Sequence, residues 1–247
     1  MNGNHNTAVV IMAGGKGTRM KSEDPKVLVP AAGRPLLAWV LDVARGVDAE
    51  RTVVIVGHQA EKVKRAFADS GVEFVVQEPQ LGTGHAVMQA EEPLNDFDGT
   101  VVVLSGDMVL VRTETVRKLL ARHRDSGAAC TVLTAMMGDP AHYGRIVRND
   151  DGTVWGIVEY RDADEATRAI NEVNSGTYAF DAAKLFAALK EVDNDNDQHE
   201  YYLTDVVGIL RGKSDTVAAV AADDPREVMG VNSQEELTEV EPLLQSK

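Results

Sequence analysis

Two kinds of apolar pattern alternate along the first half of the chain. Continuous Val- and Ile-rich runs predict buried strands at 8–12, 52–56, 72–76 and 100–104. Apolar positions at helical spacing predict helices at 36–46, opened by Pro35 and stopped by Gly46, and at 59–69, 83–90 and 113–126. This alternation predicts a doubly wound, Rossmann-like α/β sheet, whose ligands lie beyond the carboxyl ends of the strands.

The pattern changes after about residue 128. Strand-like segments at 129–137, 144–148 and 153–159 predict antiparallel additions, which form a smaller lobe facing the first half. The turn residues Asn-Asp-Asp-Gly at 149–152 join the last two as a hairpin. An acidic loop at 193–197, a helix at 201–210, a strand at 216–221 and a helix at 234–245 follow. No repeat or flexible linker divides the chain, so we expect one domain over 1–247.

Charge and cysteine usage limit the possible partners. The 247 residues include 25 Lys and Arg against 39 Asp and Glu, a net charge of −14, which excludes a general nucleic-acid binder. The single cysteine, Cys130, forms no internal disulfide, and no Cys/His cluster indicates zinc. The apolar run at 8–13 is too short for a membrane span and lacks the basic flank of a signal peptide. We therefore expect a cytoplasmic protein with no membrane partner.

A glycine-rich loop follows the first predicted strand. Its glycines allow close backbone approach to an anion, and Lys16 and Arg19 add positive charge. Lys26 follows after Pro25, so segment 15–26 carries four cations and two anions inside an acidic protein. The loop is neither a Walker A motif nor a dinucleotide fingerprint. The alternatives are a phosphate cradle and a solvated basic turn; its place after the first strand favours the cradle.

Short motifs along the chain carry a family resemblance. Residues 13–20 (AGGKGTRM) and Pro25-Lys26 resemble the G-x-G-T-R-M…P-K pattern that opens the sugar-1-phosphate nucleotidyltransferases. Further matches follow in order at 77–86, 106–107, 143–146, 157–159, 172–176, 200–205 and 230–232. Over nearly the whole chain, the ordered set resembles the uridyltransferase domain of bacterial N-acetylglucosamine-1-phosphate uridyltransferases.

This resemblance implies a fold, a reaction and its partners. The fold is that of the nucleotide-diphospho-sugar transferases, with a nucleotide-binding part at about 6–127, a small antiparallel sugar-binding lobe at about 128–231 and a C-terminal helix at 232–247. The reaction joins UTP and N-acetylglucosamine 1-phosphate into UDP-N-acetylglucosamine, a peptidoglycan precursor, and releases pyrophosphate. The acceptor phosphate is largely ionised near neutral pH, since its second pKa is about 6, so no general base is needed. Mg²⁺-assisted in-line attack on the α-phosphorus is implied.

The resemblance also assigns roles to residues. Arg19 and Lys26 are the implied catalytic cations, which balance charge on the nucleotide phosphates. Gly144, Glu159 and Asn174 map onto sugar-binding positions. Nucleotide-binding positions are implied for Met12, Ala13, Gly14, Gly15, Lys16, Gly17, Thr18, Gln77, Gly82, Thr83, Ser105 and Gly106. The Gln77 amide can both donate and accept, so it fits uracil but can rotate to fit cytosine.

Asp107 and Asn232 are the implied metal ligands. Asp107 lies just beyond the 100–104 strand, where a doubly wound sheet places its ligands, and a hard carboxylate suits Mg²⁺. The alternative for Asp107 is a turn or helix cap. The alternative for Asn232 is the N-cap of the last helix, but Ser233 with Glu236 can form that cap and leave Asn232 free.

The chain departs from the family pattern in places. Met108-Val109 stands where an apolar-Pro pair is usual, Ser105 where many members have Tyr or Cys, and residues 12–15 read Met-Ala-Gly-Gly where Leu-Ala-Ala-Gly is commoner. No hexapeptide repeats of an acetyltransferase β-helix follow, so we expect no acetyl transfer and a monomer or weak dimer. Two alternatives stay open: the same chemistry on another sugar 1-phosphate or nucleotide, and a regulator that binds nucleotide-sugar without turnover.

Overall fold

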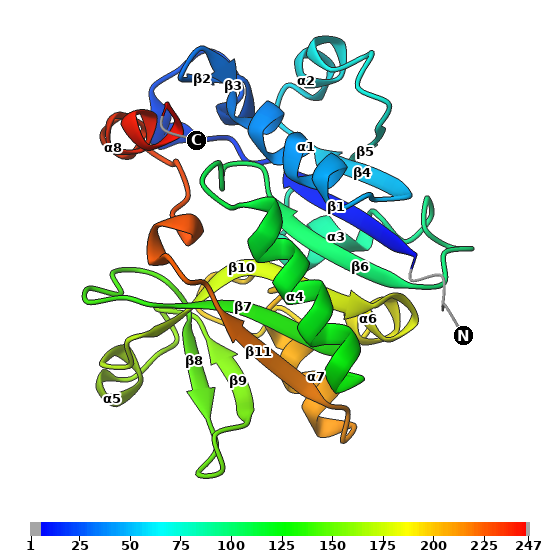
Figure 1. Cartoon of the computed structure of the whole chain (residues 1–247), viewed down its shortest axis with the longest axis vertical. Coiled ribbons are helices and arrows are strands. Elements are labelled where there is room, and N and C mark those ends of the chain that lie inside the picture. Colours follow the sequence, from blue (N-terminus) through cyan, green and yellow to red (C-terminus); the bar gives the residue numbers. More distant parts are fainter. Residues whose placement is uncertain (1–5, 246–247) are drawn as a thin grey trace.

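The computed structural model describes residues 6–245, in which nine strands form one mixed sheet (Figure 1). Seven of them follow the order β11-β7-β10-β6-β1-β4-β5, and β8 and β9 extend from β10. Their bounds are β1 (Thr7–Ala13), β4 (Arg51–Val56), β5 (Glu73–Val76), β6 (Thr100–Ser105), β7 (Cys130–Met136), β8 (Arg145–Arg148), β9 (Val154–Val158), β10 (Glu172–Asp181) and β11 (Val217–Ala221). A separate hairpin joins β2 (Pro30–Ala31) and β3 (Arg34–Pro35).

Helices cover both faces of this sheet. They are α1 (Leu36–Gly46), α2 (Ala60–Ala66), α3 (Thr83–Met88), α4 (Thr113–Ser126), α5 (Glu165–Arg168), α6 (Ala182–Leu189), α7 (Asp205–Gly212) and α8 (Gln234–Leu244). Three 3₁₀ turns lie at η1 (Thr18–Met20), η2 (Lys26–Leu28) and η3 (Pro225–Val228). Figure 1 shows α1 and α4 on one face and α3, α6 and α7 on the other.

The parallel strands β6-β1-β4-β5 confirm the doubly wound prediction. Successive β1 residues belong to opposite cores: Val9 and Ile11 pack with α1 and α4, whereas Ala8 and Val10 pack with α3. All four side chains are fully buried, which explains why the strand reads as a continuous apolar run. The register pairs Met12 with Ser105, so the carboxyl ends of these strands meet at one edge.

The second half differs from the expected arrangement in two respects. Strand β7, expected in the smaller lobe, lies inside the main sheet, parallel to β11 and antiparallel to β10. Strand β10 was not predicted, because its sequence contains Asn174, Ser175 and Gly176 and its register shifts between Asn174 and Tyr178. Only β8 and β9 extend as an antiparallel hairpin, as the turn at 149–152 predicts.

Two helix starts bear directly on the site. Helix α7 begins at Asp205 rather than at 201, because the backbone of Tyr201 exchanges hydrogen bonds with Leu81 (2.9 Å) and Gly84 (2.7 Å). Helix α8 begins with a Ser233–Glu236 capping box, which confirms the expected cap and leaves the Asn232 side chain outside it.

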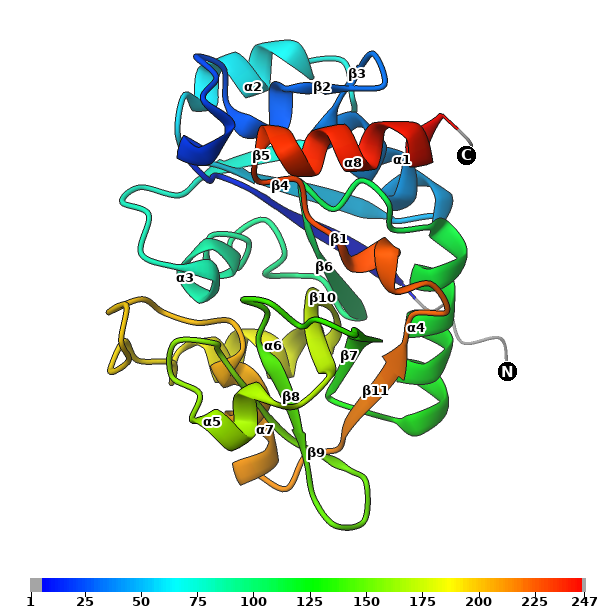
Figure 2. The same cartoon turned by 90° about the vertical axis from the view of Figure 1, so that its left-hand side faces the viewer.

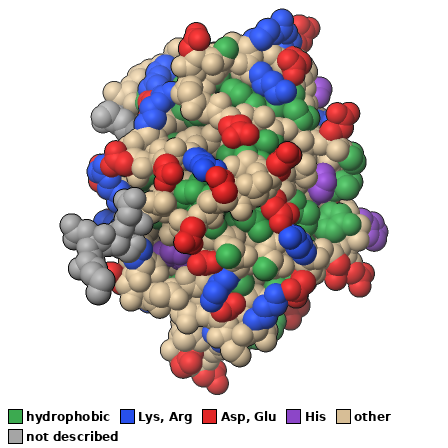
Figure 3. Space-filling view, turned by 90° about the vertical axis from the view of Figure 1, so that its right-hand side faces the viewer, with side chains coloured by type: hydrophobic (Ala, Val, Ile, Leu, Met, Phe, Trp, Pro, Cys, Tyr) green, Lys and Arg blue, Asp and Glu red, His purple; other side chains and the backbone are tan. Residues whose placement is uncertain are grey.

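Two hairpins lie at opposite ends of the molecule (Figure 2), and exposed charged side chains lie on its surface (Figure 3). Figure 2 shows α8 beside the β2–β3 hairpin at one end of the molecule and the β8–β9 hairpin at the other. Figure 3 shows acidic and basic side chains intermixed on the face it presents. Among residues 6–245, no helix has the length and apolar character needed to cross a membrane.

Candidate active site

A cavity of about 260 Å³ opens where the parallel strands end. The Gly106 N–H donates to the Met12 carbonyl (2.9 Å), which holds the turn after β6 against the end of β1. The lining residues are Met12, Ala13, Gly14, Gly15, Lys26, Val27, Gln77, Gln80, Gly82, Thr83, Ala86, Ser105, Asp107 and Glu200. Ten of the residues selected from the sequence are therefore brought together around one cavity.

The glycine-rich loop divides into two parts. Gly14 and Gly15 line the cavity, whereas Lys16, Thr18 and Arg19 are exposed and lie outside its lining. Gly17 has a left-handed φ of +58°, and a Cβ there would lie 2.6 Å from Lys26 Cβ. A glycine at this position therefore lets the loop pack directly against the Cα and Cβ atoms of Lys26.

Three polar side chains from distant parts of the chain converge at the cavity rim. The Lys26 ammonium forms an ion pair with Asp107 and donates to Asn232 Oδ1 (3.0 Å). The Lys26 and Asp107 side chains are only 15% and 11% exposed, and Ser105 Oγ donates to Asp107 Oδ1 (2.6 Å). Two side-chain oxygens thus face a single cation, and carboxylate and amide oxygens are ligands that Mg²⁺ takes in proteins.

The Gln77 amide is held in one orientation. This side chain is 6% exposed, and its Nε2 donates to the Gly82 carbonyl (2.9 Å) and lies 3.2 Å from His85 Nδ1. Burial lowers the pKa of His85, which favours a neutral ring that can accept a hydrogen bond. With its nitrogen engaged, Gln77 presents Oε1 as the acceptor for a ligand. The alternative orientation, left open by the sequence, would lose the bond to Gly82.

A second polar group forms around Gly144, Glu159 and Asn174. The Asn174 N–H donates to the Gly144 carbonyl (2.9 Å), and a Cβ on Gly144 would lie 3.3 Å from Glu159 Oε2. Glu159 accepts from Thr204 Oγ1 (3.2 Å), while Asn174 donates to the Tyr178 hydroxyl (2.7 Å). Burial raises the pKa of Glu159. The three expected sugar-binding residues therefore lie close together.

Arg145 supports this group and was not selected from the sequence. Its side chain is among the largest that are fully buried, and its guanidinium donates to the carbonyls of Ala141 (3.0 Å), Tyr143 and Arg168 (3.2 Å). Burial lowers its pKa. These bonds fix the loop that leads into Gly144. The sequence signal that could have identified Arg145 is its position directly after Tyr143-Gly144, at the start of a predicted strand.

Four residues of the cavity lining were also missed: Val27, Gln80, Ala86 and Glu200. Gln80 Nε2 donates to the Gly14 carbonyl and lies over Gly57, where a Cβ would collide with it. Gln80 and Glu200 both belong to the matched motifs, but assigning them to the cavity required knowing that the 200–204 segment runs beside the 81–84 loop.

Comparison with known proteins shows the family to which the chain belongs. Residues 9–198 match the family described as "MobA-like NTP transferase domain". This match spans well over half of the chain, so the protein belongs to that family of nucleotidyltransferases.

Individual relatives refine the comparison. The chain is 49% identical to the bifunctional protein GlmU of Oceanobacillus iheyensis over 242 residues, which are 98% of this chain and 53% of that protein. It is 46% identical to the GlmU of Synechococcus sp. over 241 residues, 97% of this chain and 53% of that one. The chain therefore spans about half the length of the curated relatives it matches.

A solved structure of UDP-glucose pyrophosphorylase complexed with UDP-glucose matches 98% of this chain and 99% of its own, with a TM-score of 0.75. The apo form of UDP-glucose pyrophosphorylase gives a TM-score of 0.78. Sequence identity is 16% in both cases, so the likeness establishes the shared fold.

Proposed function

We propose that the protein transfers a uridylyl group from UTP to N-acetylglucosamine 1-phosphate, releasing pyrophosphate. The observation that carries this proposal is the convergence of Lys26, Asp107 and Asn232 at the rim of a cavity lined by Gly14-Gly15 and Gln77. Membership of an NTP transferase family and the similarity to bifunctional GlmU proteins support the same chemistry.

Asp107 and Asn232 would hold Mg²⁺. Their oxygens already bind one positive charge, the Lys26 ammonium, so the donor set fits a cation, and hard oxygen ligands suit this metal. When bound, the metal supplies charge neutralisation for the nucleotide phosphates. Mg²⁺ usually keeps several water molecules, so two protein ligands would be enough to hold it.

The chain's own residues would position and neutralise the reactants. The backbone of Gly14-Gly15 would approach the phosphates, and Lys26 would balance charge on them as the acceptor attacks in line. Arg19, exposed on the same loop and outside the cavity lining, would add positive charge on the phosphate side of the site. The acceptor phosphate is ionised already, so no side chain need act as a base.

Base and sugar would be read at separate places. Uracil offers an N3–H donor to Gln77 Oε1, whereas cytosine offers an acceptor there, so the fixed amide favours UTP. Glu159 would accept hydrogen bonds from sugar hydroxyls, Asn174 would meet the acetamido group, and the backbone at Gly144 would pass close to the sugar.

A pyrophosphate-release assay tests the proposal. Wild-type protein with Mg²⁺ is offered UTP, CTP, ATP and dTTP, each with N-acetylglucosamine 1-phosphate or glucose 1-phosphate. We expect the fastest release from UTP with N-acetylglucosamine 1-phosphate, and near-complete loss in Asp107→Ala. Another preferred pair would keep the chemistry and change the substrate. Binding of UDP-N-acetylglucosamine without pyrophosphate release from any pair would indicate a regulator and overturn the proposal.

A further inference from the structure

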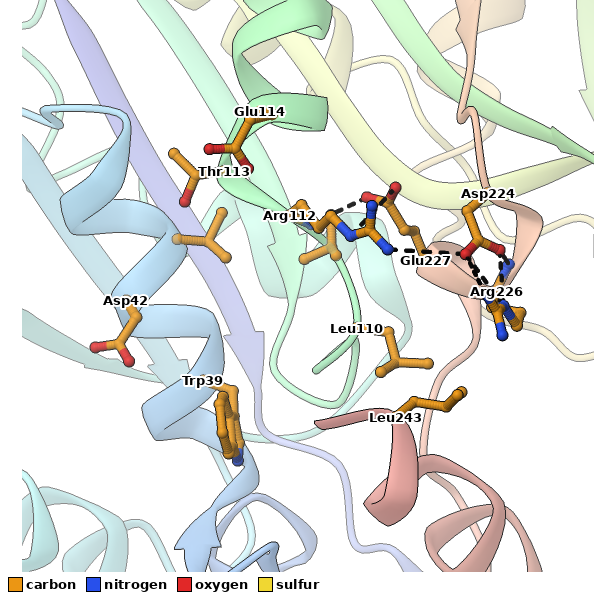
Figure 4. Close-up of a pocket in the computed structure, with 12 residues that line it drawn as sticks. Trp39, Asp42, Leu110, Arg112, Thr113, Glu114, Asp224, Arg226, Glu227 and Leu243 are labelled. Carbon is orange, nitrogen blue, oxygen red and sulfur yellow. Dashed lines mark hydrogen bonds and ion pairs between the residues drawn. The ribbon is translucent and has the colours of Figure 1, made fainter. Parts of the chain in front are cut away.

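A buried carboxylate ties the segment before Asn232 to the start of helix α4. Glu227 lies in η3, and its side chain is 3% exposed. Its Oε2 accepts hydrogen bonds from the Arg112 backbone N–H (3.1 Å) and from Thr115 Oγ1 (2.5 Å). Figure 4 shows the Arg112 side chain reaching toward both Glu227 and Asp224.

This contact satisfies a backbone donor at the N-terminus of α4. Arg112 is the N-cap residue and makes no side-chain capping bond, although the first N–H groups of a helix need acceptors. Glu227, more than a hundred positions later, accepts from the N–H of this N-cap residue, and its negative charge suits a helix N-terminus. The bond therefore fixes η3 to a rigid element of the domain.

The segment between Glu227 and Asn232 is held along its length. Val228 is 1% exposed, and its carbonyl accepts from the Tyr143 hydroxyl (3.4 Å). The Val231 N–H donates to the Asp107 carbonyl (3.1 Å). Since α4 is reached from Asp107 by a short loop, Glu227 and Val231 attach the segment to both ends of that loop.

We propose that Glu227 is a positioning residue for the metal site: by anchoring η3 to α4 it fixes Asn232 Oδ1 beside the Asp107 carboxylate. The inference rests on the proposed function for the identity of the metal ligands. Glu227 touches neither substrate nor metal and acts only through Asn232. Residues that hydrogen-bond a metal ligand directly typically contribute about 10- to 100-fold to metal affinity, and Glu227, which acts through the backbone, should lie near the lower end of that range.

The test measures Mn²⁺ affinity by EPR titration in the presence of UDP-N-acetylglucosamine, without turnover. We expect Glu227→Ala to weaken Mn²⁺ binding about tenfold. The control is Arg226→Ala, one residue away, whose guanidinium bonds Asp224 within the same turn (2.7 Å); its affinity should stay within about twofold of wild type. An unchanged affinity in a folded Glu227→Ala protein overturns the proposal.

A double-mutant cycle with Asn232→Ala separates positioning from general destabilisation. If Glu227 acts through Asn232, adding Glu227→Ala to Asn232→Ala weakens Mn²⁺ binding no further. Multiplicative effects would overturn the proposal, as would an Asn232→Ala variant that binds Mn²⁺ like wild type. If Glu227→Ala does not fold, Thr115→Val removes one bond to the carboxylate; it should weaken binding about threefold, and no change overturns the proposal.

The two proposals fail in distinguishable ways. In one outcome, the wild-type protein converts no UTP and sugar phosphate while its Mn²⁺ affinity still depends on Glu227 through Asn232. That result would refute the proposed reaction and support the positioning role of Glu227. Full uridylyl transfer with a Mn²⁺ affinity that is independent of Glu227 would support the proposed reaction and refute the positioning role of Glu227.

Discussion

The ammonium of Lys26 forms an ion pair with the carboxylate of Asp107, 81 positions later in the chain, inside a cavity at the ends of the parallel strands. Asn232 Oδ1 binds the same ammonium. The lysine ammonium therefore contacts both oxygens that we propose as metal ligands and balances the charge of the Asp107 carboxylate. Asp107 and Asn232 would be available to hold Mg²⁺ when Lys26 turns from them toward the nucleotide phosphates.

Loss of Lys26 should affect turnover more than binding. Lys26→Ala removes the charge that balances the phosphates at transfer, so we expect kcat to fall about 10²- to 10³-fold with a smaller rise in the KM for UTP. Steady-state kinetics measures both constants. Lys62→Ala, which removes an exposed lysine paired with Asp24 on the surface, is the control and should stay near wild type. A Lys26→Ala enzyme with wild-type kcat would contradict this role.

Gly17 should be needed for activity as well as for stability. In Gly17→Ala, the new methyl group would press on Lys26 Cβ and displace the lysine, so we expect kcat to fall at least tenfold. The matched control is Gly33→Ala, which has a similar left-handed φ of +78° but nothing within 4 Å of its Cβ. It should lose only about 1 kcal/mol of unfolding free energy. Equal kinetic effects in the two variants would show that the contact with Lys26 is irrelevant.

Base selection should depend on Gln77. The fixed amide predicts that wild-type protein prefers UTP to CTP by about 100-fold in kcat/KM, because CTP would place an acceptor against Oε1. Gln77→Ala removes this discrimination and should bring the ratio to within about tenfold. The control is Gln89→Ala. Gln89 follows helix α3 and lies outside the cavity lining, and its amide donates to the His85 carbonyl. Retained selectivity in Gln77→Ala would move base reading elsewhere.

Asp205 should make stability depend on pH. Burial, with Asp193 and Asp162 nearby, raises the pKa of Asp205 from 3.8 to about 6. The folded protein thus holds this proton to higher pH than the unfolded chain, so the stability that Asp205 contributes falls as pH rises from about 4 to about 6.

Asp205→Asn removes that loss. We expect it to raise the free energy of unfolding by about 1 kcal/mol at pH 7.5, allowing for solvent screening of a partly exposed group, with no gain at pH 4. Urea denaturation at both pH values measures this. Asp69→Asn, at an exposed position, should change neither value. A gain of the same size at both pH values would exclude titration as the cause.

The strand-end residues of the site were predictable because two independent signals agreed. Val-rich runs located β1, β5 and β6, and the motifs that follow them contain Gly14, Gln77 and Asp107. Strand β10 was not predictable from its pattern, since a bulge and three small or polar residues interrupt it. Its place between β6 and β7 is a property of the whole sheet.

Contacts between distant segments could not be read from the sequence. The bonds from Lys26 to Asp107 and from Glu227 to α4 join residues that are far apart in the chain, and no local pattern predicts them. The orientation of Gln77 depends on the Gly82 carbonyl and on a His85 ring whose pKa is lowered by burial. Burial of that kind exists only in the folded chain.

The most direct test of the account is a crystal structure of the protein grown with UDP-N-acetylglucosamine and Mg²⁺. We predict the diphosphate against Gly14-Gly15 and Lys26, the uracil N3 facing Gln77 Oε1, and one ion between Asp107 and Asn232. A diphosphate bound away from the first loop, with no ion near the Asp107 carboxylate, would contradict the account.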